Sequence, residues 1–404
     1  MSLRALLVQN RDFRRLFLAS VVSLTGDWFS FVAVADLVSR LTGRPGAAAF
    51  VYAATVLPVF LASPIAGAVA DRFDRKRILV ISDLVRVPLA LLLCLAALWG
   101  SVVIAITAVI ALGIASSFHD PVTSAATPNL VAEEDLARAQ SLMGAVWGSM
   151  LLVGAGIGGV VAELFGIQAA FMIDAASFAL SAWLVSGIER PMQQRAPAPR
   201  PAGQLREALR YIRGDRLVAR LVLAKVGVSS ANGTVGLLPA FAHGTFAGTN
   251  IATGLLFAAR GLGAMLGPIL ARALAGATPG PRAIILVCGA STLLYVGVYA
   301  ALPLTPWFAL AMLLVAIAHL GGGAQWAMST YGLQVATPDH LRGRVLSLDY
   351  GLATLAIGVS ALVAGGLADA YGEASATWWL AGAGAMYGVG WLVWALSGAR
   401  RPPA

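Results

Sequence analysis

The sequence predicts an all-α polytopic membrane protein, with twelve transmembrane helices arranged as two pseudo-symmetric six-helix halves. Two features of composition lead to it: 59% of the 404 residues are hydrophobic, and only 12% are charged. Soluble domains carry about 45–50% apolar and about 25% charged residues. Water could not dissolve a chain of this composition, so the lipid bilayer is its expected solvent. Helices follow because each membrane segment must satisfy its backbone hydrogen bonds internally.

Twelve apolar runs follow one another along the chain. A helix that crosses a membrane needs about 20 apolar residues, and each run reaches roughly that length. The runs lie at about 16–39, 47–70, 78–99, 102–124, 141–164, 168–188, 218–241, 250–272, 282–302, 306–330, 344–368 and 376–397. A polar stretch separates the first six from the last six. We therefore expect an N-terminal half at 1–188, a cytoplasmic linker at 189–217 and a C-terminal half at 218–404.

The two halves also resemble each other in sequence. Residues 136–142, which open the fifth run, are similar to residues 341–348, which open the eleventh, and both runs end in paired glycines. A duplicated six-helix unit is the usual architecture of secondary transporters, in which the substrate path lies between the repeats. The repeat therefore favours a transporter.

Basic residues are distributed unevenly among the segments that join the runs. With a cytoplasmic N-terminus, most of the 28 lysines and arginines fall in cytoplasmic segments, and only Arg40 and Arg44 fall outside. This asymmetry predicts that both termini are cytoplasmic, and we expect a bacterial inner membrane. The same rule explains the net charge of +9, so the charge gives no reason to expect a nucleic-acid partner. Residues 204–216 of the linker are typical of an amphipathic surface helix.

The loop between the second and third runs carries the most specific motif. It reads Gly67-Ala-Val-Ala-Asp71-Arg72-Phe-Asp74-Arg75-Lys76-Arg77. Gly67 allows helices to approach closely, and Asp71 can bridge helices through charge-assisted hydrogen bonds to the cations beyond it. This loop resembles the signature of the major facilitator superfamily, with Asp74 where a glycine is commoner.

The resemblance covers essentially the whole chain. Asp-Arg-Phe-Asp-Arg at 71–75, Leu57-Pro58 and Pro-Asp-His-Leu-Arg-Gly-Arg at 338–344 are similar to the branch of bacterial exporters that includes macrolide efflux and enterobactin export proteins. It implies the major facilitator fold and transport by alternating access. It also implies a latch that joins the halves on the cytoplasmic side when the cavity faces outward. The latch residues carried over are Gly67, Asp71, Arg72, Arg75 and Arg77.

A glycine-rich stretch lies in the fifth run. Gly154-Ala155-Gly156-Ile157-Gly158-Gly159 resembles the antiporter motif of drug exporters, but Ala155 replaces the proline of that motif. Small residues four apart also permit close helix packing. We expect Gly154, Gly158 and Gly159 to act mainly by packing, which weakens the inference of proton antiport without removing it.

Ionisable residues inside the runs cost about 2.5–3.5 kcal/mol each at the bilayer centre, so each needs a partner, a cavity or a task. Asp27 lies halfway along the first run, which lines the cavity in the resembled family. A carboxylate there can bind and release protons near neutral pH, so Asp27 is our first candidate for proton coupling, with a static ion pair as the alternative. Asp36 is a second candidate proton site or a partner for Arg260. Asp174 and Asp349 are expected to be structural.

Arg260 in the eighth run cannot lose its proton, so we interpret it as a counter-ion or an anion-binding group. Its neighbours in the expected substrate cavity are His319 and the aromatic residues Trp28, Phe31, Trp147 and Trp326. A hydrogen-bonded packing role is the alternative for His319. Lys225 lies near a cytoplasmic helix end, where its long side chain can reach the membrane surface.

Several function classes lack their motifs. The sequence contains no Walker A loop, nucleophile elbow, His-Glu-x-x-His or Cys-x-x-Cys, so an ATP-driven pump or a membrane hydrolase is not expected. Cys94 and Cys288 lie far apart in apolar runs. We expect no cofactor, no metal and no enzymatic activity.

The sequence therefore predicts a secondary active transporter that exports an amphipathic, drug-like molecule by proton antiport. One alternative is a lysophospholipid or siderophore transporter of the same fold without simple proton antiport. Another is a membrane sensor or scaffold that transports nothing. The expected partners are the small-molecule substrate, protons and membrane lipids, with the protein acting as a monomer.

Overall fold

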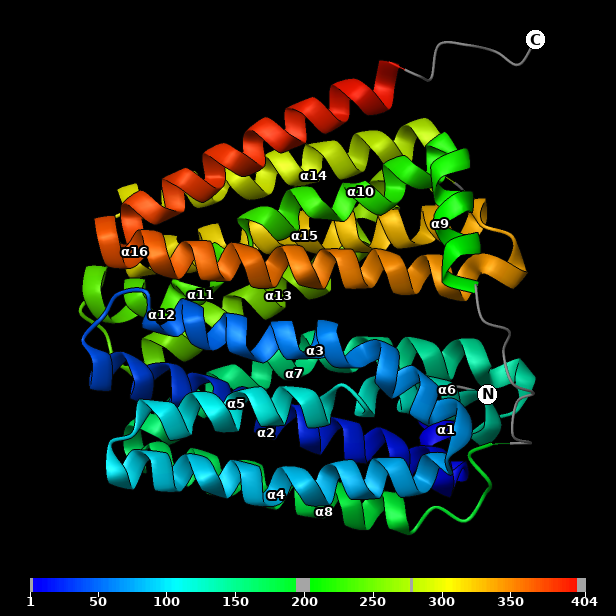
Figure 1. Cartoon of the computed structure of the whole chain (residues 1–404), viewed down its shortest axis with the longest axis horizontal. Helices are drawn as coiled ribbons and strands as arrows, with labels where there is room; N and C mark the ends of the chain where they lie inside the picture. Colours follow the sequence, from blue (N-terminus) through cyan, green and yellow to red (C-terminus); the bar gives the residue numbers. More distant parts are fainter. Residues whose placement is uncertain (1–2, 194–203, 277–278, 398–404) are drawn as a thin grey trace.

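Long helices fill the molecule and lie side by side in two bundles (Figure 1). The computed structural model describes residues 3–193, 204–276 and 279–397, apart from the side chains of residues 3, 63, 64, 67, 68, 70, 71, 120, 137, 204, 205, 339 and 340. Within the described residues, ten helical segments are long and apolar enough to cross a membrane. The protein is therefore an all-α multi-pass membrane protein.

The N-terminal bundle contains the first six predicted runs. Its helices are α1 (Leu3–Gln9), α2 (Arg11–Thr42), α3 (Ala47–Arg72), α4 (Arg75–Trp99), α5 (Val102–Ser116), α6 (His119–Leu130), the short η1 (Glu133–Asp135), α7 (Leu136–Leu164) and α8 (Ile167–Ser186). The fourth run is divided between α5 and α6. Local signals set several helix ends: Asn10 and Asp74 cap the first turns of α2 and α4 through their side chains, and Gly43 and Gly100 end the same helices in the left-handed conformation.

The C-terminal bundle contains the last six runs. Its helices are α10 (Arg216–Ala231), α11 (Gly233–Gly236), α12 (Leu238–Ala240), η2 (Phe241–Thr245), α13 (Asn250–Ala275), α14 (Pro281–Ala301), η3 (Leu302–Leu304), α15 (Phe308–Ala336) and α16 (Asp339–Ser397). The seventh run is divided between α10, α11 and α12. The last two runs share α16, which turns at Gly372, where φ is 82°. Each predicted run thus lies in helical structure.

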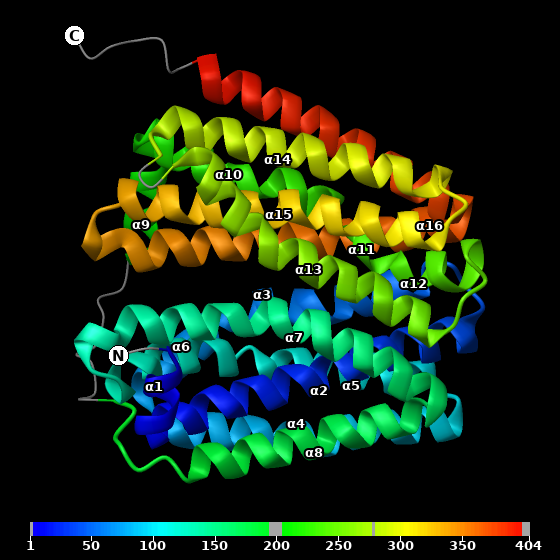
Figure 2. The ribbon, with the colours of Figure 1, turned by 180° about the vertical axis from the view of Figure 1, so that it is seen from behind.

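The bundle has two distinct ends (Figures 1 and 2). We call the end that carries α9 (Gln204–Gly214) the linker end, and the opposite end, where α3 begins, the far end. The linker segment predicted as an amphipathic helix forms α9, which packs against α10 and α16.

The two halves meet along α3–α16 and α7–α13, and their closest contacts cluster toward the far end. Asp369 of α16 accepts a hydrogen bond of 2.9 Å from the Gly46 backbone N–H and forms an ion pair of 2.8 Å with Arg44. Gly159 of α7 lies directly against Gly254 of α13. Toward the linker end the ribbons of the halves diverge in both views (Figures 1 and 2).

Candidate functional site

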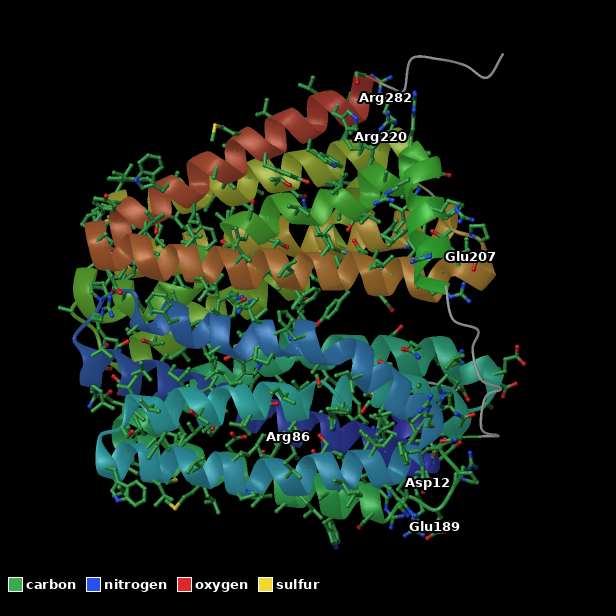
Figure 3. All side chains as sticks on the ribbon, viewed as in Figure 1. Asp12, Arg86, Glu189, Glu207, Arg220 and Arg282 are labelled. Atoms are coloured by element: carbon green, nitrogen blue, oxygen red, sulfur yellow. The ribbon has the colours of Figure 1, made fainter. Side chains whose placement is uncertain are left out.

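A buried charge network lies inside the N-terminal half, midway between its ends (Figure 3). Arg86 of α4 is buried and binds Asp83 of the same helix. It also donates to Ser23 Oγ at 3.2 Å, and its Nη1 lies 3.9 Å from Asp27 Oδ2 of α2. The ring of Phe178 covers the guanidinium at 4.2 Å. Asp27, which we expected to be ionisable, thus faces a fixed cation and remains 36% exposed.

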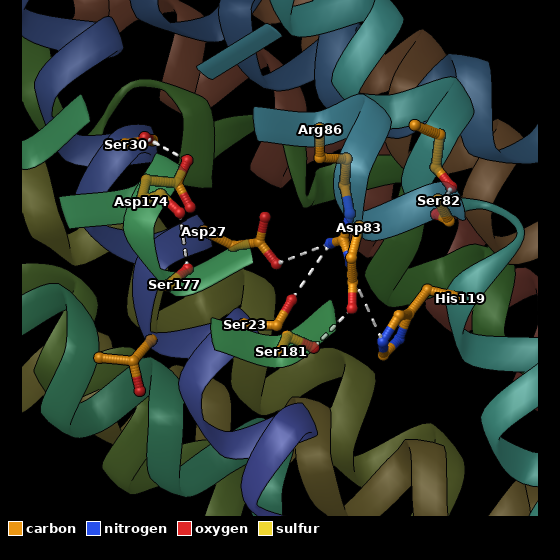
Figure 4. A network of polar contacts seen from close by, with 12 residues as sticks. Ser23, Asp27, Ser30, Ser82, Asp83, Arg86, His119, Asp174, Ser177 and Ser181 are labelled. Carbon is orange, nitrogen blue, oxygen red and sulfur yellow. Dashed lines mark hydrogen bonds and ion pairs between the residues drawn. The ribbon is translucent and has the colours of Figure 1, made fainter. Parts of the chain in front are cut away.

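Two further groups belong to the network (Figure 4). His119 of α6 lies 3.9 Å from Asp83, which also accepts a 2.6 Å hydrogen bond from Ser181. Asp174 of α8 accepts a hydrogen bond from Ser30, while its Oδ1 is buried and has no hydrogen-bond partner. We define the Asp27 network as Asp27, Asp83, Arg86, His119 and Asp174. It holds three carboxylates and one arginine. Because the acids outnumber the fixed cation, the network can take up positive charge, such as a proton.

A second cluster lies at the boundary between the halves. Arg260 of α13 is 6% exposed. Four aromatic rings surround it with their centroids 5.7–5.9 Å from its Cζ. The rings belong to Trp28 of α2, Tyr52 of α3, Trp147 of α7 and Phe257 of α13. We call these five residues the Arg260 cage.

Phe31 supports the Arg260 cage from behind. Its ring centroid lies 5.1 Å from that of Phe257, 5.8 Å from that of Trp28 and 6.0 Å from that of Tyr52. The structure therefore brings together four residues that the sequence assigned to the substrate cavity, namely Trp28, Phe31, Trp147 and Arg260.

His319 and Trp326 lie elsewhere. His319 is buried in the C-terminal half, shares a 2.9 Å hydrogen bond with Tyr299 Oη and contacts the ring of Tyr295. A polar chain leads from Tyr295 back to the cage: Asn232 donates to Tyr295 at 3.0 Å and accepts from Tyr52 at 2.9 Å. His319 is thus linked to the cage through these polar contacts, but it is not one of the residues that surround Arg260.

Trp326 belongs to a separate ion pair of the C-terminal half. Its ring lies 4.9 Å from Lys225 Nζ, and that ammonium binds Asp349 and donates to Thr330 at 2.9 Å. The expectation that Lys225 reaches the membrane surface is wrong. Its side chain is buried because α10 directs it inward, onto the carboxylate of α16.

Asp36 lies near the far end and serves the contact between the halves. It accepts a 2.7 Å hydrogen bond from Arg40 Nε of its own helix. Across the boundary it lies 3.4 Å from Asn250 Nδ2 and 3.7 Å from His243 Nε2. Its contacts are therefore with these three groups, and Arg260 instead donates to Tyr52 Oη at 3.4 Å.

Comparison with known proteins identifies the family and the fold of the chain. A family described as transmembrane secretion effectors, of the major facilitator superfamily, matches residues 5–398. The chain belongs to this family. Its fold is also that of solved transporters: a POT family transporter, in complex with a thioalcohol-conjugated peptide, aligns over 96% of each chain with a TM-score of 0.77 at 11% identity.

Three curated relatives of this transporter are bacterial. The multidrug efflux pump Tap of Mycolicibacterium fortuitum is 30% identical over 88% of this chain and 89% of the pump. The enterobactin exporter EntS of Salmonella typhi is 27% identical over 90% of this chain and 87% of the exporter. For YkuC of Bacillus subtilis, an uncharacterized MFS-type transporter, the identity is 26%, and the chain spans 57% of that relative's length.

The loop between α3 and α4 of the transporter contacts its own half. Arg75 donates to the carbonyls of Ala125 and Met192, at 2.7 and 3.1 Å, and Arg77 donates its backbone N–H to Asp74. Arg72 is exposed. The surroundings of Gly67 and the side chain of Asp71, which we assigned to the latch, lie outside what the structure describes.

The glycine-rich stretch of α7 packs in two directions. A Cβ at Gly154 would lie 3.2 Å from Trp28 Cβ, and one at Gly158 would lie 2.9 Å from Phe29 Cα, so both face α2. A Cβ at Gly159 would lie 2.5 Å from the Asn250 carbonyl oxygen of α13. The stretch therefore seats α7 against its own half and against the other half at once.

Some site residues were missed from the sequence. Asp83, Arg86 and His119 were not assigned a role. Asp83 and Arg86 stand three residues apart in an apolar run, and the cost of intramembrane charge is a signal that could have found both. Tyr52 and Phe257 gave no such signal, because aromatic residues are common throughout membrane helices.

Proposed function

We propose that this transporter exports an amphipathic, drug-like small molecule by alternating access, in exchange for protons. It would act as a lipid-embedded monomer in a bacterial inner membrane, with both termini in the cytoplasm. The distribution of basic residues supports that orientation. Tap is an efflux pump and EntS an exporter, and the similarity of the chain to both supports the outward direction.

The Asp27 network carries the proposal of proton coupling. Three carboxylates share one arginine inside the bundle, and adding a proton reduces the repulsion among them. Asp27 is the most accessible of the three, because Asp83 and Asp174 are buried. A proton on Asp27 would remove the attraction across its 3.9 Å distance from Arg86. This change would weaken the contact between α2 and α4, so that the two helices could move relative to each other during a conformational change.

The contacts between the halves support an inward-facing state. With the linker end in the cytoplasm, the far-end contacts of Asp36, Arg44 and Asp369 close the outer side. The cycle would load substrate from the cytoplasm, break these far-end contacts and form the latch around Asp71, Arg72, Arg75 and Arg77. Protonation of Asp27 from outside would favour the return.

Proteoliposomes with an imposed pH gradient test the coupling. The transported probe is chosen from amphipathic dyes of both charges, including ethidium and 5-carboxyfluorescein. In Asp27→Asn the side chain keeps its size and loses its ionisation, so we expect gradient-driven transport to fall at least about tenfold, to the rate without a gradient.

Glu207→Gln is the matched control. It also removes one carboxylate, but Glu207 lies on the surface helix α9 and pairs with Arg344 at 2.8 Å, far from the network (Figure 3). Full gradient dependence in Asp27→Asn would contradict the assignment. Flux without any gradient dependence would favour the alternative of a lipid or siderophore transporter, and binding without flux would favour a sensor.

A further inference from the structure

The Arg260 guanidinium is a buried cation whose donors lack acceptors. Its Nε and Nη1 are buried without a hydrogen-bond partner, and its Nη2 reaches Tyr52 Oη at a long 3.4 Å. Among the described side chains, no carboxylate lies within 4.0 Å of it. Buried arginines are normally paired with an acid, because an unpaired buried charge is strongly destabilising. This site therefore lacks a negative partner.

The aromatic rings of the cage cannot supply the missing hydrogen-bond acceptor. Their π faces attract the positive charge, but a ring offers no lone pair to an N–H in the guanidinium plane. Trp28 adds a third unused donor, since its Nε1 is also buried without a partner. The cage thus presents three nitrogens with unused N–H groups, enclosed by flat apolar surfaces. Its one oxygen, Tyr52 Oη, already accepts from Arg260 Nη2 and donates to Asn232.

The cage is assembled from both halves. Trp28, Tyr52 and Trp147 come from the N-terminal half, and Arg260 and Phe257 from α13 of the C-terminal half. A movement of one half against the other must therefore change the cage. Trp147 is its most accessible wall, 46% exposed, whereas Phe257 is buried. A ligand would reach the guanidinium past the Trp147 ring.

We propose that the Arg260 cage is the substrate site, and that the substrate is an aromatic organic anion. This inference rests on the proposed transport function and names its substrate class. The carboxylate, sulfonate or phosphate of such a molecule accepts the unused N–H groups of Arg260 and Trp28, for which the planar guanidinium fork is suited. Its flat ring packs between the aromatic walls.

Three probes that share a naphthalene ring and differ in charge test the inference. They are 1-naphthalenesulfonate, the neutral 1-naphthalenesulfonamide and the cationic 1-naphthylmethyl-trimethylammonium. Binding is measured by isothermal titration on the full chain in phosphatidylcholine nanodiscs. We expect the sulfonate to bind at least about tenfold more tightly than the sulfonamide, because only the sulfonate carries a negative charge to pair with the guanidinium. The cation should bind most weakly. Equal affinities, a preference for the cation or no binding of the sulfonate would overturn the proposal.

Substitutions of Arg260 test whether the preference for the sulfonate comes from the cage. Arg260→Gln should lower sulfonate affinity roughly tenfold to hundredfold, to that of the sulfonamide, and Arg260→Lys should retain part of the preference. Arg282→Gln, at the exposed start of α14, removes the same charge elsewhere and should leave binding unchanged. Unchanged sulfonate binding in Arg260→Gln contradicts the inference. If that variant does not fold, the charge series in the unaltered chain decides.

A lipid headgroup offers the same anionic chemistry from another source. Nanodiscs that contain phosphatidylglycerol separate the two: unchanged sulfonate affinity supports a substrate anion, whereas loss of sulfonate binding assigns the site to lipid and overturns the inference. Asp27→Asn separates this inference from proton coupling, because it should keep the anion preference. Failure of coupling with anion binding intact, or the reverse, identifies which proposal is wrong.

Discussion

Buried ionic residues in this protein fall into two kinds, which their partners distinguish. Lys225 and Asp349 form a direct pair covered by Trp326. Among the described side chains, Arg260 and Asp174 form no ion pair: Arg260 contacts four aromatic rings, and Asp174 accepts a hydrogen bond from Ser30. Because a buried charge is costly unless paired, paired groups suit a structural role, and groups without an ion pair suit binding of a substrate or a proton.

Lys225→Met tests the structural role of the first kind. It leaves Asp349 buried and unpaired, so we expect the free energy of unfolding to fall by about 3–5 kcal/mol. Replacing both partners, in Lys225→Met with Asp349→Leu, should recover most of this loss. Unfolding in mixed micelles with increasing denaturing detergent measures both variants. A single variant as stable as the unaltered chain would show that the pair does not hold α10 to α16.

The helix α7 is one of the elements that connect the two halves to each other. Gly154 and Gly158 face α2, and Gly159 faces α13 one residue further on. Glycines allow the backbones to approach closely, as membrane helices require where apolar side chains gain nothing by leaving lipid. The same helix carries Trp147 and so sets the distance between the cage walls. Its packing role and a role in transport are therefore compatible.

Gly159→Ala tests this contact. The added Cβ would lie 2.5 Å from the Asn250 carbonyl oxygen, a backbone atom, so the helices must separate. We expect a loss of about 1–3 kcal/mol in stability, read as a lower melting temperature. Gly144→Ala is the matched control on the same helix, because a Cβ there meets nothing within 4 Å, and it should be neutral or slightly stabilising. Equal effects of the two variants would show that the α7–α13 contact is not tight.

At the scale of the whole molecule, polar contacts join the halves at the far end, whereas the ribbons of the halves diverge toward the linker end (Figures 1 and 2). Asp369 joins the halves through Arg44 and the Gly46 backbone, and Asp36 joins them through Asn250 and His243. Asp36 and Asn250 are buried, whereas Arg44 is exposed, so the ion pair between Arg44 and Asp369 contributes little. A weak contact of this kind can break in every transport cycle without a large barrier.

Asp369→Asn should shift the molecule toward opening at the far end. The variant loses the charge that Arg44 binds, so we expect the closed population to fall by up to about fivefold. Electron–electron distances between spin labels at Leu41 and Leu304, in a background without the two native cysteines, report this opening. Glu373→Gln is the control, because Glu373 bonds Thr245 of its own half. An unchanged distance distribution in Asp369→Asn would contradict the role of this contact.

Much of the fold could be predicted because the bilayer leaves few choices. Apolar runs of sufficient length must be helices, and each of the twelve predicted runs lies in helical structure. The candidate site was predicted in part. Asp27, Trp28, Trp147 and Arg260 were identified from charge and aromatic character in the runs, whereas Tyr52 was missed because its role depends on a neighbour 208 residues away.

The sequence by itself determined the membrane class, the helical structure of its apolar runs and the presence of costly charges inside the bilayer, because hydropathy and charge are properties of each segment. The tertiary structure alone decided which of those charges are paired. Lys225 and Asp349 are 124 residues apart and bind each other, while Arg260, in an equally apolar run, meets four rings and, among the described side chains, no acid. Pairing depends on which helix faces pack together, and that information is shared among distant segments.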